Sequence, residues 1–172
     1  MTSNVPARPE LHRRLLPAFV FDTDQPRPLY ILKAWLLAFL PSIALAALVT
    51  WLAPNPPAPD LGGPGLRMAV AVVIFAPVVE TLLMTPPVLI LNRYFGPTAA
   101  ILGSAVLWGV LHHLAAALWG LIIWWPFLVF SAVLLAWREK GLTQAMLMVM
   151  AVHAMQNLAP ALALLASGGG AD

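Results

Sequence analysis

Four residues with side chains suited to acid–base chemistry lie inside long apolar stretches of this 172-residue sequence: Glu80, His112, His153 and Asn157. Glu80 is the only acidic or basic residue, histidines aside, well inside such a stretch. A charged side chain at the centre of a bilayer costs about 3 kcal/mol on insertion scales, and such residues usually mark a functional site. The alternative is a neutral glutamic acid that bonds to a neighbouring helix.

The spacing of these residues predicts that they lie at one depth. Counted from the predicted helix ends, Glu80 lies about 13 residues in, His112 about 14 and His153 about 12, a spread of about 3 Å along the helix axes. His153 and Asn157 are four residues apart and share one helix face. His113 points about 100° away from His112, so we expect only one of the two to face the site. A lone histidine in a membrane helix more often makes an interhelical hydrogen bond, but these four groups at one depth favour catalysis.

Such a group of side chains suits peptide hydrolysis. A buried carboxylate can take a proton from water as a general base, and imidazole and carboxamide donors can stabilise the developing oxyanion. The sequence has no cysteine, and no serine is expected at this level because Ser104 is two turns away from His112, so a water nucleophile fits better than a covalent enzyme. Pro86 and Pro160 each remove a backbone donor, and kinks at these positions would admit water or a peptide.

The composition predicts the elements that must position these residues. Hydrophobic residues make up 61% of the sequence and charged residues only 9%, against about 25% charged in soluble domains. Uncharged stretches long enough to cross a bilayer, about 20 residues, separate the charges. We therefore predict an all-α, polytopic membrane helix bundle with about five transmembrane helices. The predicted spans are residues 34–53, 66–91, 98–118, 119–137 and 142–166, of which the fourth has aromatic ends typical of interfacial belts.

The chain divides into an arm, one bundle and a tail. We predict a polar arm at residues 1–30, a transmembrane bundle at 31–166 whose site-bearing core covers 66–166, and a flexible tail at 167–172. In the arm, Leu11–Phe21 is expected to lie on the membrane surface, and no secretory signal peptide is evident. Eight Lys and Arg residues on the side of the arm against one on the other place the amino terminus in the cytoplasm. The high alanine, proline and glycine content fits a bacterial inner membrane.

Three segments together resemble the CAAX protease and bacteriocin-processing family (the CPBP or ABI family) of intramembrane glutamic proteases. Its motifs are Glu-Glu-x-x-x-Arg, Phe-x-x-x-His and His-x-x-x-Asn, in that order. Here Glu80 takes the first Glu position, Trp108–His112 (WGVLH) resembles the second motif, and His153–Asn157 (HAMQN) fits the third. The resemblance covers roughly residues 70–160, including the turn WREKG. Two positions depart from it, because Thr81 and Thr85 stand where the second Glu and the Arg are usual.

The resemblance implies an intramembrane endopeptidase that cleaves a peptide or membrane-anchored protein, including carboxy-terminal sorting helices. It implies that Glu80 activates water with the help of His112, and that His153 and Asn157 form the oxyanion site. No cofactor is required, although a divalent metal such as zinc would take Glu80, His112 and His153 as ligands. The loss of the usual Glu and Arg points to altered specificity, low activity or a pseudoenzyme.

Three other classes of function remain open. A non-catalytic membrane chaperone or immunity protein would keep the pocket without turnover. A haem protein could use two histidines on different helices as axial ligands, and a proton-coupled carrier could use a Glu–His relay. The expected partners are membrane lipid and a peptide or protein substrate. No nucleic-acid partner is expected, because the basic residues flank the predicted spans, and the sequence leaves the oligomeric state open.

Overall fold

The computed structural model describes residues 11–57 and 65–168, and every regular element within these ranges is helical. The predicted all-α fold is therefore confirmed. Residues 1–10 of the predicted arm and 169–172 of the predicted tail lie outside the described residues. The elements are α1 (Leu11–Leu15), η1 (Ala18–Phe21), α2 (Arg27–Leu52), α3 (Leu66–Val70), η2 (Ala71–Phe75), α4 (Ala76–Ala115), α5 (Gly120–Trp137), η3 (Arg138–Lys140) and α6 (Leu142–Gly168).

Three helical stretches in the described part of the chain are long and apolar enough to cross a membrane. They are Arg27–Leu52, Leu66–Ala115 and Gly120–Lys140. Few residues of the first stretch are buried inside the protein, and several large apolar ones, such as Leu40 and Ile43, are exposed, whereas the third stretch is mostly buried. Outward-facing apolar side chains match a hydrocarbon solvent. The chain is therefore a membrane-embedded helical protein.

The longest stretch, Leu66–Ala115, consists of two helical segments that meet at Gly96, and the parts of α4 before and after this residue are called its first and second arms. This residue has φ 82° and ψ 172°, the one non-helical conformation within α4. Gly96 lacks a Cβ and can adopt this positive φ, while the Pro97 ring disfavours the α conformation at the preceding residue. Leu91 Cδ1 consequently lies 3.0 Å from where a Cβ on Gly103 would be placed, although a continuous helix would separate these residues by about 18 Å.

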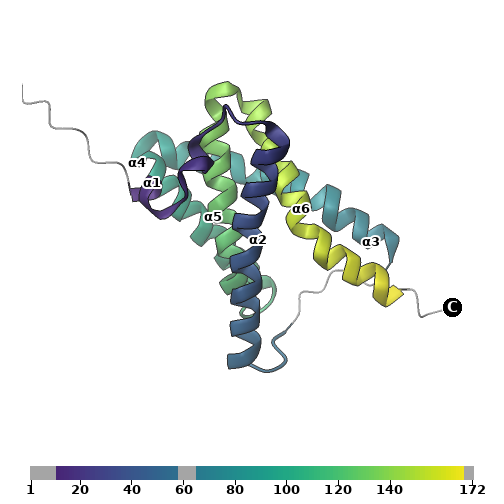
Figure 1. Cartoon of the computed structure of the whole chain (residues 1–172). Coiled ribbons are helices and arrows are strands. Elements are labelled where there is room, and N and C mark those ends of the chain that lie inside the picture. The colour runs from purple at the N-terminus through teal and green to yellow at the C-terminus, as the bar shows by residue number, and fades with distance from the viewer. Residues whose placement is uncertain (1–10, 58–64, 169–172) are drawn as a thin grey trace, which may run out of the picture.

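The helices pack around α5. In Figure 1, α5 and α2 stand side by side, while α3 and the first arm of α4 run next to α6 and diverge from α2. The core of the bundle combines Tyr30 and small side chains of α2 with larger side chains of the other helices. Its fully buried members include Ala34 and Ala38 of α2, Met84 and Val88 of α4, Val129, Val133, Leu134 and Trp137 of α5, and Val149 and Val152 of α6.

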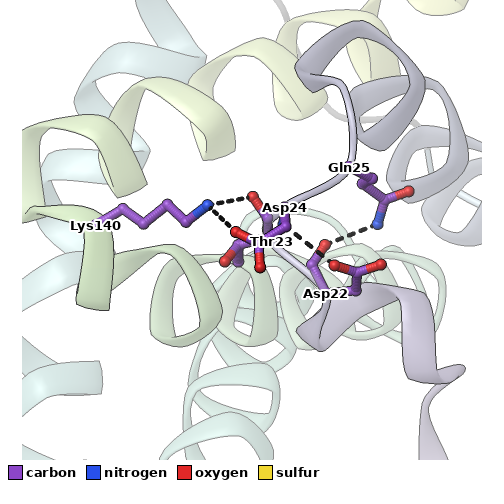
Figure 2. A network of polar contacts seen from close by, with 5 residues as sticks. All are labelled: Asp22, Thr23, Asp24, Gln25 and Lys140. Carbon is purple, nitrogen blue, oxygen red and sulfur yellow. Dashed lines mark hydrogen bonds and ion pairs between the residues drawn. The ribbon is translucent and has the colours of Figure 1, made fainter.

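The amino-terminal arm is fixed to one end of the bundle. Tyr30 Oη at the start of α2 donates a buried hydrogen bond of 2.9 Å to the Val20 carbonyl. Lys140 Nζ, in the turn between α5 and α6, donates to the Thr23 carbonyl at 2.7 Å and to Asp24 Oδ1 at 2.6 Å. Figure 2 shows Lys140 reaching across to the arm in this way. The arm and the α5–α6 turn therefore lie at the same end.

The contact between Lys140 and Asp24 predicts a titration shift. The hydrogen bond and charge of Lys140 hold the pKa of Asp24 below its ordinary value. Any stabilisation from this pair is thus complete above the ordinary pKa and is lost as the pH falls through the lowered one. Lys140→Met should raise the pKa of Asp24 in an NMR titration, whereas Arg27→Met should not. An unchanged Asp24 titration in Lys140→Met would show that the contact does not form.

Candidate active site

A cavity of about 400 Å³ lies between α2, α4, α5 and α6, and its lining includes all four residues that the sequence singles out. Glu80 comes from the first arm of α4, His112 from the second arm, and His153 and Asn157 from α6. The break at Gly96 is what allows two residues of one helical stretch to reach the same cavity. Most of the remaining wall is apolar, which lowers the local dielectric and strengthens electrostatic interactions inside.

Glu80 and His153 face each other across the cavity wall. Glu80 Oε2 lies 3.7 Å from His153 Nε2, and the side chains are 24% and 6% exposed. This separation is longer than a direct hydrogen bond. Catalytic contacts in the absence of substrate are often this loose. The carboxylate is thus the more accessible partner and the imidazole the buried one.

The ring of His112 is oriented by its own helix. His112 Nδ1 lies 2.8 Å from the Trp108 carbonyl oxygen, one turn earlier. A carbonyl oxygen can only accept a hydrogen bond, so Nδ1 carries the proton. In the neutral imidazole this leaves the lone pair on Nε2. His112 is therefore set up to accept a proton rather than to donate one from Nε2.

Aromatic rings hold both imidazoles in place. The Phe127 ring contacts both, with centroid distances of 5.4 Å to His112 and 5.6 Å to His153. Phe130 stacks on His153 at 4.6 Å, and Trp119 meets His112 edge-on at 4.6 Å. Trp119 lies at one of the aromatic ends that predict an interfacial belt, whereas Phe127 and Phe130 lie in the middle of α5. All three rings line the cavity, a role that composition alone does not reveal.

Asn157 binds a carbonyl that a proline has left without its helical donor. Ala76 donates its N–H to Ala71, five residues back, so η2 is a π-helical turn. Pro77 has no N–H to offer. The Val72 carbonyl, which either residue would otherwise engage, instead accepts a 2.9 Å hydrogen bond from Asn157 Nδ2. One N–H of the predicted oxyanion donor thus ties α6 to the helix that carries Glu80.

The cavity is also lined by two polar residues that were not predicted from the sequence, Gln156 and Ser42. Gln156 follows His153 by three residues, and its Oε1 is buried without a hydrogen-bond partner within residues 11–57 and 65–168. The i, i+3 spacing from His153 is the signal that could have found it. Ser42 of α2 also lines the cavity, which corrects the expectation that no serine lies at this level. Its hydroxyl donates to the Ala38 carbonyl at 2.7 Å and is thereby engaged.

The two positions that depart from the family motif are buried in the packing of α4. Thr81 is 1% exposed, and its hydroxyl has no partner among the described residues. Thr85 donates from its hydroxyl to the Thr81 carbonyl at 2.7 Å. Neither residue lines the cavity. These positions therefore supply no charge beside Glu80.

Other predicted features separate into those near the cavity and those away from it. His113 accepts a 3.1 Å hydrogen bond at Nδ1 from the Leu118 N–H and does not line the cavity. Pro160 lines it, whereas Pro86 does not, and α4 keeps helical dihedral angles through Pro86. Within the part of the chain that the structure describes, no three His, Cys, Asp or Glu side chains are arranged to hold a metal ion.

Comparisons with known proteins leave the site to be interpreted from its own geometry. No protein-family model matches the sequence, and neither a curated protein nor a solved structure is significantly similar to it.

Proposed function

We propose that this protein is an intramembrane endopeptidase that uses a water molecule activated by Glu80. The observation that carries the proposal is the 3.7 Å approach of Glu80 to His153 in a mainly apolar cavity that His112 and Asn157 also line. A carboxylate, two imidazoles and a carboxamide in one low-dielectric space are the groups that water-mediated peptide hydrolysis requires. Packing of a helix bundle alone does not require so many polar groups in one place.

In the proposed reaction, Glu80 removes a proton from water while the oxygen attacks the carbonyl carbon of the scissile peptide. His112, with its Nε2 lone pair, assists the proton transfer. His153 and the second N–H of Asn157 donate to the oxyanion of the tetrahedral intermediate. The C–N bond then breaks, and the proton held by Glu80 passes to the leaving amine.

The proposal extends to topology and substrate. We infer five membrane crossings, because the two arms of the Leu66–Ala115 stretch and the helix α6 each supply an apolar segment. We propose that the amino terminus faces the cytoplasm, because the basic residues are concentrated on that side. We also propose that the membrane is a bacterial inner membrane. The resemblance to the CPBP family supports a peptide or membrane-anchored protein as substrate, including proteins with carboxy-terminal sorting helices.

One observation favours a second candidate, a non-catalytic membrane chaperone or immunity protein. Thr81 and Thr85 are buried and uncharged where the resembled motif has an acid and a base. Such a protein would bind a membrane segment in the same cavity without cleaving it. The haem alternative is less well supported, because His153 Nε2 is directed at the Glu80 carboxylate instead of an open axial position.

The test is a cleavage assay in cells. Membrane-anchored proteins encoded beside this protein would be co-expressed with it and followed by intact mass, using wild type, Glu80→Gln and His153→Ala. A mass shift in wild type that both variants lose supports the endopeptidase. No shift with any neighbour, from a protein shown to be folded and inserted, would contradict it and favour the non-catalytic candidate.

A stability measurement compares the two carboxamide side chains of α6, Asn157 and Gln156, of which Asn157 is bonded to Val72. Asn157→Leu should lower the free energy of unfolding in detergent by about 1–3 kcal/mol, because the partly buried Val72 carbonyl then loses its hydrogen-bond donor. Gln156→Leu is the matched control and should be neutral or stabilising, since the Gln156 Oε1 has no partner to lose within the described residues. Equal stability of the two variants would show that the Asn157 bond does not tie α6 to η2.

A further inference from the structure

A second cavity, lined by several polar and charged side chains, lies at the end of the bundle that carries the amino-terminal arm. It has a volume of about 260 Å³, and its lining includes Arg13 of α1, Asn92 of α4 and Arg138 of η3. A neighbouring cavity of about 440 Å³ shares Asn92 and Arg138 and adds Arg93. Asn92 and Arg138 thus line both cavities, with Arg13 in the smaller and Arg93 in the larger, and none of these residues lines the proposed active-site cavity.

The guanidinium groups of these cavities are not paired with carboxylates in the part of the chain that the structure describes. No ion pair joins Arg13, Arg93 or Arg138 to an acid among residues 11–57 and 65–168. Among the described residues, Glu139 is the one carboxylate that lines the smaller cavity, and no Asp or Glu lines the larger one. The nearby Lys140, by contrast, is paired with Asp24 at 2.6 Å. Among the described residues, the positive charge around Asn92 is therefore balanced only in part, by Glu139 in the smaller cavity.

Aromatic and aliphatic groups surround this charge. The Arg13 guanidinium lies over the Phe21 ring at 4.8 Å, and that of Arg93 lies over the Tyr94 ring at 6.0 Å. Leu142 lines the larger cavity and is 41% exposed. Guanidinium forks bind phosphate oxygens with matching geometry. Basic pockets between transmembrane helices at the edge of the bilayer bind lipid headgroups.

We propose that these adjoining cavities bind the phosphate group of an anionic phospholipid headgroup. Arg13, Arg93 and Arg138 contact the phosphate oxygens, the Asn92 amide donates to them, and the acyl chains run along the apolar rim. A lipid accounts for the exposed leucine and tyrosine beside the charge, which a free phosphate ion would leave without a role. This inference does not depend on the proposed endopeptidase activity.

Native mass spectrometry of the full chain in detergent tests the proposal. Dioleoylphosphatidylglycerol would be titrated into wild type, the double variant Arg13→Gln/Arg138→Gln and the charge-matched control Arg14→Gln/Arg27→Gln. Dioleoylphosphatidylcholine, titrated separately, is the zwitterionic comparison. Neither control residue lines the cavities. Loss of the two cavity guanidiniums should weaken phosphatidylglycerol binding about tenfold or more, while the control stays within about twofold of wild type. Equal losses in both double variants would overturn the site.

A gain-of-function variant makes the result independent of any folding defect. Glu139→Gln removes the Glu139 carboxylate from the smaller cavity and should tighten phosphatidylglycerol binding several-fold. Unchanged or weaker binding would count against the proposal. Inorganic phosphate, added as a competitor, identifies the source of the group. Displacement of the lipid only at high millimolar phosphate supports a lipid site, whereas displacement at low micromolar phosphate would overturn the lipid in favour of a free-phosphate site.

Discussion

Glu80→Gln is expected to lower the cleavage rate by at least about 100-fold while leaving the protein folded, because a positioned general base contributes about 10²–10⁴-fold. Glutamine keeps the shape of the side chain but cannot accept a proton from water. The carboxylate is mostly buried and lies 3.7 Å from His153 Nε2, and no Lys or Arg side chain within residues 11–57 and 65–168 forms an ion pair with it. Neutralising it removes a desolvation cost, so thermal stability should be equal or higher.

Two companion variants make this result specific. Glu80→Asp keeps the carboxylate but withdraws it by one methylene, and should retain part of the activity. Asp22→Asn makes the same chemical change in the exposed arm and should cleave at the wild-type rate. The measurement is the rate of product formation with the substrate found by co-expression, beside a thermal unfolding curve for each variant. Full activity in Glu80→Gln would exclude Glu80 as the base.

Gly120→Ala is expected to give the largest loss of stability among single-methyl changes. A Cβ atom at Gly120 would lie 2.0 Å from the Gly109 carbonyl oxygen and 2.8 Å from His113 Cβ. The first atom belongs to the backbone and the second is attached directly to it, so neither can move by a change of rotamer, and α4 and α5 must move apart. We expect destabilisation of about 3 kcal/mol, the upper end for overpacked cores, together with loss of activity, since this crossing sets the position of His112 one turn away.

A matched glycine provides the control. At Gly103 a Cβ atom would meet Leu91 Cδ1 at 3.0 Å, the far end of a flexible side chain. Leu91 can change rotamer, so Gly103→Ala should cost less than about 1 kcal/mol. Thermal unfolding in detergent compares the two variants directly. Equal midpoints would mean that the helices do not cross closely at Gly109 and Gly120.

The sequence predicts the helices well because their signal is strong and local. Long uncharged stretches require helices in a bilayer, and the predicted boundaries near residues 53, 66, 118 and 142 lie close to those of the structure. The turn at Gly96 is tighter than expected, because a single glycine with positive φ replaces a loop. That Glu80, His112 and His153 share one cavity could be predicted from their positions along the helices, because the rise per residue of a helix is constant.

The finer features of the site were not predictable because they depend on packing between helices. Nothing in the spacing of Asn157 reveals that its amide binds Val72, a contact that needs both the π-helical turn and the placement of α6. Ser42 and Phe130 reach the cavity from α2 and α5, whose orientation about their own axes depends on neighbouring side chains. A uniformly apolar helix carries no periodic signal for that orientation.

The π-helical turn at Ala71–Phe75 has a consequence for comparing sequences in this region. Such a turn is equivalent to a one-residue insertion in an α-helix, so its length matters more than the identity of its side chains. Deleting one residue there would rotate Leu66–Val70 by about 100° relative to Glu80 and withdraw the carbonyl that Asn157 binds. A gap of one position in an alignment at this point therefore marks a change of helix register and a different attachment of α6.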